Sequence, residues 1–156
     1  MSTPQLGPVH AQLAALVGTW EGKEQLATTP WSPGGTARGE HSFAVTAGGF
    51  ALVQEYAEHR DGAPMLTGHG VFSVDPSDGC VVWFWFDSIG YPPLTPSRGS
   101  FASDGTTLRV EKTTPRGVQR ASFAIAGEVL VHRIEVRLPE ASEFACLVDA
   151  RYERCA

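Results

Sequence analysis

His69 and Asp87 are the two residues of this chain whose types best suit the transfer of a proton. They lie in two apolar segments, "MLTGHGVFSV" and "VVWFWFD", and the turn sequence "DPSDG" lies between them. A histidine exchanges protons near neutral pH, and a carboxylate hydrogen-bonded to its ring fixes the tautomer. Such a pair could act as acid and base in a cofactor-free isomerase, cyclase or hydrolase. The structural alternative is a hydrogen-bonded wall histidine and a "DS" pair that caps the loop at Ile89.

The two residues meet in only one register of the predicted hairpin. Pairing of Val74 with Cys80 would place the histidine opposite Trp85 and Thr67 opposite the aspartate. The histidine and aspartate would then be diagonal neighbours on one face, and a matching parity across "HRDGA" would bring Glu55 to that face. A slip of one residue would separate the set, because successive strand residues point to opposite faces.

A second hypothesis is that the protein binds a small, largely apolar molecule without transforming it. Large rings line many concave sites, although Trp20 and Trp83 could equally fill the interior. Arg120 interrupts an apolar strand and could pair with a ligand carboxylate, or with a glutamate such as Glu135 or Glu55. The expected ligand contacts are Glu55, Thr67, His69, Trp85, Asp87, Trp31, Tyr91 and Arg120. A third hypothesis is a structural or interaction module with an interior filled by side chains.

Other chemistries have no signature in the sequence. His41, His69 and His132 fall in separate predicted strands without H-x-H or H-E-x-x-H spacing, so we expect no metal site. There is no G-x-S-x-G motif of a serine nucleophile. The three cysteines form no C-x-x-C pair, which is typical of reduced thiols in a cytoplasmic protein.

The charge and hydropathy of the chain exclude several classes of partner. The formal net charge of -5 gives no support for binding to nucleic acid or to an anionic membrane surface, because both need a basic face. No apolar run approaches the length that spans a bilayer, and the first residues, "MSTPQLGPVH", lack the features of a secretory signal. We therefore expect a cytoplasmic protein that binds neither nucleic acid nor membrane.

The elements that must position these residues are almost all strands. The segment "PVHAQLAALVG" has apolar residues at helical spacing, a proline suited to the first turn and a glycine suited to the stop. Short apolar segments separated by turn sequences predict strands at 19–27, 36–45, 50–58, 64–74, 80–87, 97–103, 106–113, 117–126, 129–138 and 143–153. No long helix separates any two strands, so neighbours should pair antiparallel. We predict one all-β domain over residues 1–156, with an N-terminal segment and helix at 1–17 and a ten-stranded up-and-down barrel at 18–154.

Loop lengths distinguish the two ends of this barrel. In an up-and-down barrel, alternate connections lie at the same end. The connections after the second, fourth, sixth and eighth strands are tight, and the N-terminal helix enters at their end, which it should plug. The connections after the first, third, fifth and ninth strands are mostly longer and carry Trp31, His59 and Tyr91. Long loops commonly carry function, so this second end is the predicted mouth.

Several motifs resemble those of a known superfamily. "GTWEGKE", which opens the first predicted strand, resembles the first-strand signature of the calycins: lipocalins, fatty-acid-binding proteins and nitrobindins. The helix, "LVGTWEG", the tryptophan loop, "GHGVFSVDP" and "WFDSIGYPP" together resemble an uncharacterised bacterial family of calycin-like barrels, a domain of unknown function. This resemblance implies a ten-stranded barrel around a cavity. Nitrobindin-like proteins hold haem through a histidine late in the chain, but the last strand here has none, so we expect no haem or other cofactor.

Bulky rings on both faces of one strand predict a second apolar surface. If the face of Trp85 points inward, then Phe84 and Phe86 point outward, and we expect Leu66 and Phe72 to extend this patch on the neighbouring strand. A soluble monomer seldom exposes a large contiguous apolar patch. We therefore expect a homodimer packed through the outer face of the third to fifth strands. The alternative is a flattened barrel that buries part of both faces.

Overall fold

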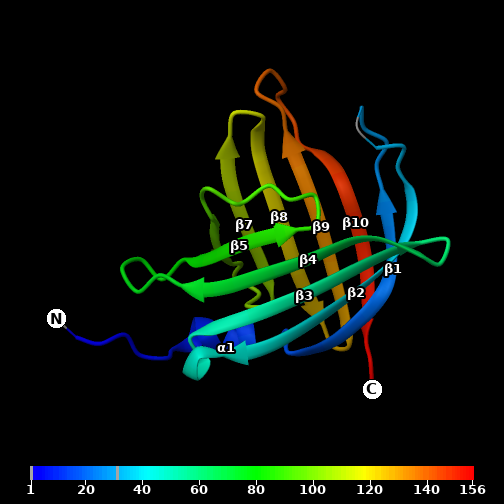
Figure 1. Ribbon diagram of the computed structural model, residues 1–156. Helices are drawn as coiled ribbons and strands as arrows, with labels where there is room; N and C mark the ends of the chain where they lie inside the picture. The colour runs from blue at the N-terminus through cyan, green and yellow to red at the C-terminus, as the bar shows by residue number, and fades with distance from the viewer. Residues whose placement is uncertain (1, 31) are drawn as a thin grey trace.

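Ten antiparallel strands close into a barrel, and one short helix precedes them (Figure 1). The computed structural model describes residues 2–30 and 32–156. The elements are α1 (Pro8–Ala14), β1 (Gly18–Leu26), β2 (Gly35–Thr46), η1 (Ala47–Gly49), β3 (Ala51–Arg60), β4 (Ala63–Val74), β5 (Val81–Asp87), β6 (Ser97–Phe101), β7 (Thr107–Thr114), β8 (Gly117–Ala126), β9 (Val129–Arg137) and β10 (Ala145–Arg154). Consecutive strands pair, and β1 pairs with β10 to complete the ring. The predicted all-β, ten-stranded up-and-down barrel is confirmed.

The helix α1 lies against one end of this barrel (Figure 1). It ends at Ala14, one turn earlier than the sequence pattern predicted. Leu13 and Leu16 are buried in the core, and the side chain of Gln12 donates a hydrogen bond of 3.2 Å to the backbone oxygen of Gly105. Gly105 belongs to the short connection between β6 and β7, so the helix covers the end where the tight connections were expected to lie.

The interior next to the helix is packed with apolar side chains. Alternation along each strand sends every second residue inward, and six of the inward residues at this end are at most 1% exposed: Trp20, Leu52, Phe72, Val81, Leu108 and Leu130. Each large apolar side chain buried in this way contributes about 1.5–3 kcal/mol to stability. The indole nitrogen of Trp20 donates a hydrogen bond of 2.9 Å to the backbone oxygen of Leu16, so the largest of these side chains has its polar atom satisfied.

The register of the β4–β5 hairpin differs by one residue from the prediction, which was wrong on this point. Val74 pairs with Val81 rather than with Cys80, because the turn closes on a backbone hydrogen bond of 2.9 Å from Asp75 to the oxygen of Cys80. The carboxylates of Asp75 and Asp78 each accept hydrogen bonds from backbone groups two residues ahead and so shape this four-residue turn.

This register separates the predicted acid–base pair. His69 pairs with Phe86 and Thr67 shares its face, so both point away from the interior. Trp85 and Asp87 share the face of the buried Trp83 and point inward. The expected diagonal contact between His69 and Asp87 is therefore absent, because the two side chains lie on opposite faces of the sheet.

The pairing between β5 and β6 is short. It covers only Val81–Trp83 and Ser97–Gly99, whereas β4 pairs with β5 along the whole of β5. Arg98 of β6 reinforces this seam with ion pairs to Asp75 at 3.1 Å and Asp78 at 2.6 Å in the β4–β5 turn. Beyond Trp83 the two strands separate, and the connection 88–96 runs back above β5 before β6 begins (Figure 1).

The outer apolar surface is smaller than expected. Phe72 is fully buried and Leu66 shares its inward face, so neither belongs to the outer patch that the sequence predicted. Phe84 and Phe86 do point outward and are 38% and 46% exposed. Their outer-face neighbours include Val71, which pairs with Phe84.

Two histidines lie inside the barrel as neutral groups. His41 and His132 are 2% and 5% exposed, and their ring centroids are 5.8 Å apart. The Nδ1 atom of His132 donates a hydrogen bond of 2.9 Å to the backbone oxygen of Ser122. Burial lowers the pKa of His132 to about 4. Burial, with repulsion from His132, also holds the pKa of His41 well below its usual value.

These lowered pKa values predict that the barrel loses stability in mild acid. Above pH ~6.5 both histidines are neutral in the folded and the unfolded chain. As the pH falls from there to about 4, unfolded His132 takes up a proton that the folded protein excludes, so the free energy of unfolding falls by about 1.4 kcal/mol per pH unit. In urea melts, His132→Phe should flatten the pH dependence by this slope, with the exposed His59→Phe as control. An unchanged slope in His132→Phe would contradict the neutral buried histidine.

The homodimer through the outer face of β3 to β5 stays a prediction, which light scattering tests. The chain has a mass of 16.7 kDa, so a dimer should scatter with twice this mass at micromolar concentration. Phe84→Glu places a charge in the outer patch and should yield a folded monomer. Leu138→Glu changes an exposed apolar side chain outside this patch and should leave the dimer intact. A wild-type protein with the monomer mass would rule the dimer out.

Candidate functional site

The half of the barrel interior away from α1 contains several side chains that are partly exposed to solvent. Its inward residues on β3, β5, β9 and β10 include Tyr56, Trp85, Ile134, Val136 and Val148, which are only half-buried, unlike Trp20, Leu52 and Phe72 beside the helix. We call this region the mouth half; it also contains Glu24, Glu58 and Asp87. Partial exposure of inward-facing aromatic and apolar side chains means that a small molecule could reach them from this end.

Three inward glycines make room for large side chains of neighbouring strands. A Cβ atom at Gly39 would collide with the carboxylate of Glu24, and one at Gly68 would collide with the ring of Trp85. A Cβ atom at Gly70 would collide with the side-chain oxygen of Gln54. All three glycines are buried, and they lie on the inward faces of β2 and β4. They therefore let a large side chain of a neighbouring strand lie across the interior.

A chain of hydrogen bonds fixes the tautomer of His41. The indole nitrogen of Trp83 can only donate, and it donates to the side-chain oxygen of Gln54 at 3.1 Å. The amide nitrogen of Gln54 therefore faces Nδ1 of His41, at 3.1 Å, and donates to it. The neutral ring must then carry its proton on Nε2, which is buried and has no hydrogen-bond partner among the described residues. The Nε2–H group of His41 is thus a donor whose tautomer Gln54 and Trp83 fix and which has no acceptor among the described residues.

Glu24 is the centre of a second polar group. It is 1% exposed, and both of its oxygens accept hydrogen bonds of 2.8 Å from the hydroxyl of Tyr56, while the hydroxyl of Tyr152 donates to one of them. Burial raises the pKa of Glu24, although the two tyrosine hydrogen bonds oppose this effect. Burial and the nearby Glu24 also raise the pKa of both tyrosines, which therefore remain hydrogen-bond donors at neutral pH.

Glu58 lies beside this group without a partner. It pairs in register with Gly39, shares the inward face of β3 with Tyr56, and is 7% exposed. Within residues 2–30 and 32–156, its carboxylate forms no hydrogen bond and no ion pair. Arg60 is the nearby cation, but it donates to the backbone oxygen of Gly34 at 3.3 Å, and its Nε atom is buried without a partner.

Aromatic rings form a wall of the mouth half. The ring centroid of Trp85 lies 5.5 Å from that of Trp83 and 6.0 Å from that of Tyr56. Asp87 fixes the indole of Trp85 by accepting a hydrogen bond of 3.0 Å from its nitrogen, and its other oxygen accepts one from the backbone of Ile89. The "DS" pair thus caps the following loop, as the structural alternative expected, and its aspartate also orients a ring in the mouth half.

The remaining predicted site residues lie outside the interior. Glu55 shares the face of His69, as expected, and accepts a hydrogen bond of 2.5 Å from its ring, but on the exposed outer surface. Thr67 is exposed beside them. Arg120 points outward, pairs with Glu111 at 2.7 Å and covers the ring of Phe144. Tyr91 is 75% exposed in the β5–β6 connection, and Trp31 lies outside the described residues.

Sequence analysis missed the residues that form the interior polar groups. Glu24 follows Trp20 by four residues and Glu58 follows Tyr56 by two, so each shares the face of a ring on its strand. This parity would have identified both glutamates. The tyrosine at position 152, by contrast, reaches Glu24 from the opposite end of the chain.

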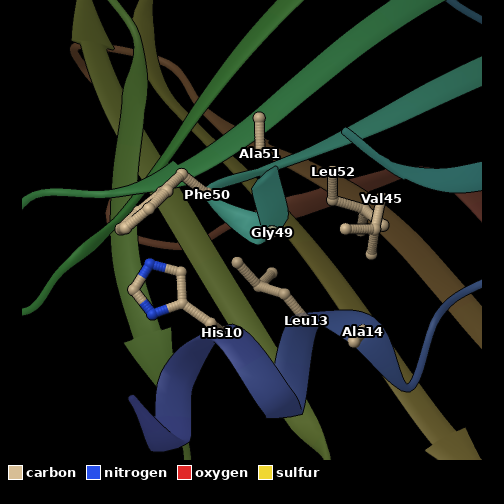
Figure 2. A pocket seen from close by; sticks show the side chains of 8 residues that line it. All are labelled: His10, Leu13, Ala14, Val45, Gly49, Phe50, Ala51 and Leu52. Atoms are coloured by element: carbon tan, nitrogen blue, oxygen red, sulfur yellow. The ribbon is translucent and has the colours of Figure 1, made fainter. Parts of the chain in front are cut away.

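Two further spaces lie at the helix end, outside the mouth half. One has a volume of about 10 Å³, about that of one water molecule, and lies between α1 and the β2–β3 connection (Figure 2). His10 and Leu13 of the helix point toward Phe50 and Leu52 across it (Figure 2). The other, of about 370 Å³, lies between the N-terminal segment and the side chains of Phe50, Val74 and Pro76.

In the described part of the chain, no cluster of three His, Cys, Asp or Glu side chains could hold a metal ion, and no helix is long and apolar enough to cross a membrane.

Comparisons with known proteins support the fold and name a family. The structure of an S-type phycobiliprotein lyase from Guillardia theta is similar, with a TM-score of 0.67, over 98% of this chain and 99% of that one. The two sequences are 8% identical, so this similarity concerns the fold alone. No curated protein matches the sequence. Residues 5–129 match the model of a family described as "Protein of unknown function (DUF1579)", which covers most of the chain, and the protein therefore belongs to the DUF1579 family.

Proposed function

We propose that the barrel binds a small, largely apolar molecule in its mouth half. The observation that carries this proposal is the contrast between the two halves of the interior. Large inward side chains beside α1, such as Trp20 and Phe72, are at most 1% exposed, whereas Tyr56 and Trp85 present partly exposed rings toward the other end. Proteins gain stability by burying such rings, so aromatic faces left open inside a barrel favour a ligand that covers them.

Unpaired polar atoms in the interior support the same proposal. Buried polar groups in folded proteins almost always have hydrogen-bond partners, and an unsatisfied one costs about 1–3 kcal/mol. The Nε2 atom of His41 is such a group, and Glu58 is a nearly buried carboxylate without a partner among the described residues. A structural module whose interior is filled by its own side chains would have no use for an unpaired imidazole nitrogen or an unpaired carboxylate in that interior. The similar barrel from Guillardia theta is named a lyase, so a protein of this fold can have an activity beyond a structural role.

The acid–base enzyme has weaker support than the binding protein. It was based on His69 and Asp87, which lie on opposite faces of the sheet. His69 instead bonds to Glu55 on the outer face of the sheet, whereas the rings that would hold a substrate lie on the inner face. Ligand binding is therefore the function that the geometry of the site favours.

A pair of neighbouring substitutions on β5 tests the proposal. Nile red, a neutral dye that fluoresces in apolar surroundings, should bind saturably to the wild type. Trp85→Ala removes an inward ring and should weaken this binding about tenfold, which corresponds to about 1.4 kcal/mol. Phe86→Ala removes the adjacent outward ring and should leave the affinity unchanged.

Thermal unfolding should first show that both variants are folded, with Trp85→Phe as a milder substitute if the alanine variant is not. Native mass spectrometry of the purified protein would in addition identify a ligand that co-purifies. Failure of the dye to bind, or equal weakening by the two alanine variants, would contradict a site inside the barrel.

A further inference from the structure

Among the residues that the structure describes, Glu58 contacts no group of opposite charge. It is 7% exposed, and its inward position on β3 faces Gly39 on one neighbouring strand and Leu66 on the other. Neither neighbour can donate a side-chain hydrogen bond. Removing a carboxylate from water is costly unless a donor or cation replaces the lost hydration. Glu58 thus differs from the adjacent Glu24, which two tyrosine hydroxyls satisfy.

The rings next to Glu58 favour the same kind of partner. Tyr56 lies two residues earlier on the same face, and Gly68, its partner on β4, leaves room for the ring of Trp85. The planes of the Tyr56 and Trp85 rings are inclined by 54°, with their centroids 6.0 Å apart. The face of an aromatic ring is electronegative and attracts cations, most strongly when water is excluded.

The charges that face the mouth half are predominantly negative. Glu24, Glu58 and Asp87 all lie on inward faces of their strands. Arg60 forms no ion pair within 4.0 Å in the described part of the chain and donates instead to the backbone of the 27–34 loop. Lys112 lies on the inward face of β7, across the barrel from β3. Burial raises the pKa of Glu24 against the two tyrosine hydrogen bonds, and repulsion from Glu58 raises it further while attraction by Arg60 lowers it.

We propose that the ligand is an organic cation, an apolar molecule with a protonated or quaternary amine whose charge lies between the Glu58 carboxylate and the rings of Tyr56 and Trp85. This inference rests on the proposed function and names the ligand class of the same site. It replaces the expectation that Arg120 would bind a ligand carboxylate, because Arg120 lies outside the barrel and is paired with Glu111. An anionic ligand in the mouth half would meet the carboxylates of Glu24, Glu58 and Asp87, against the two cations of Arg60 and Lys112.

Three probes of nearly the same shape and different charge test the inference. They are benzyltrimethylammonium, its neutral isostere (2,2-dimethylpropyl)benzene, and 3-phenylpropanoate. Binding is followed by the indole N–H signal of Trp85 in ¹⁵N-labelled protein, which Trp85→Phe identifies by its loss. The ammonium should bind about tenfold more tightly than the neutral isostere, and the carboxylate should bind most weakly.

Two isosteric variants on one strand locate the effect. Glu58→Gln keeps the shape of the side chain, removes its charge and should abolish the preference for the ammonium over the neutral isostere. Glu55→Gln makes the same change on the outer face of β3 and should leave this preference intact. Without ligand, the unfolding temperature of Glu58→Gln should equal or exceed that of the wild type, because a nearly buried carboxylate with no partner among the described residues is removed. A marked decrease would show that Glu58 has a partner within the protein and would overturn the inference.

The outcomes separate this inference from the proposed function. If the neutral isostere binds as tightly as the ammonium, or if Glu58→Gln leaves the preference unchanged, the ligand class is wrong and binding in the mouth half stands. The same holds if Nile red shifts the Trp85 signal and none of the three probes does. If Nile red also leaves this signal unchanged, the proposed site itself is wrong.

Discussion

Closure of the sheet is the constraint on which the rest of the structure depends. Because β1 pairs with β10, every strand has one face toward an enclosed interior and one face toward solvent. A polar side chain on the inward face must find a partner inside or remain near the open end. The hydrogen-bonded chain from Trp83 through Gln54 to His41 and the tyrosines around Glu24 satisfy this requirement within the protein. Glu58 has no such partner in the described part of the chain, and it lies in the half where inward side chains are partly exposed.

The architecture could be predicted from the sequence because its signals are local. Alternating apolar residues and turn sequences define the strands, and loop lengths distinguish the two ends of the barrel. The register of one hairpin could not be predicted in this way. It is decided by the side chains of Asp75 and Asp78, which bond to backbone groups within the turn. Six residues rather than five therefore lie between Val74 and its partner on β5. This one-residue difference moved His69 from the interior to the outer surface.

The site was harder to predict than the fold, for two physical reasons. Parity along a strand identifies Glu24 and Glu58 as inward residues, but only once it is known which face is inward. The contacts that give these residues different roles come from distant parts of the chain. Tyr152 lies 128 residues after the glutamate that it satisfies. The need for glycine at an inward position such as Gly39 likewise becomes clear only when the side chain that lies over it, here Glu24, is known.

The short seam between β5 and β6 has a consequence for how the ring can close during folding. The two strands of this seam are joined by the nine residues 88–96, a far shorter loop than the one that β1 and β10 close, so the chain itself keeps them close and three residue pairs suffice. β1 and β10 stand at opposite ends of the chain, and bringing them together costs the loop-closure entropy of almost the whole protein. Seven residue pairs, Trp20–Leu26 with 148–154, offset that cost. The shortest strand pairing therefore joins β5 and β6, which the chain already holds close together. A longer pairing joins β1 and β10, which only their hydrogen bonds hold together.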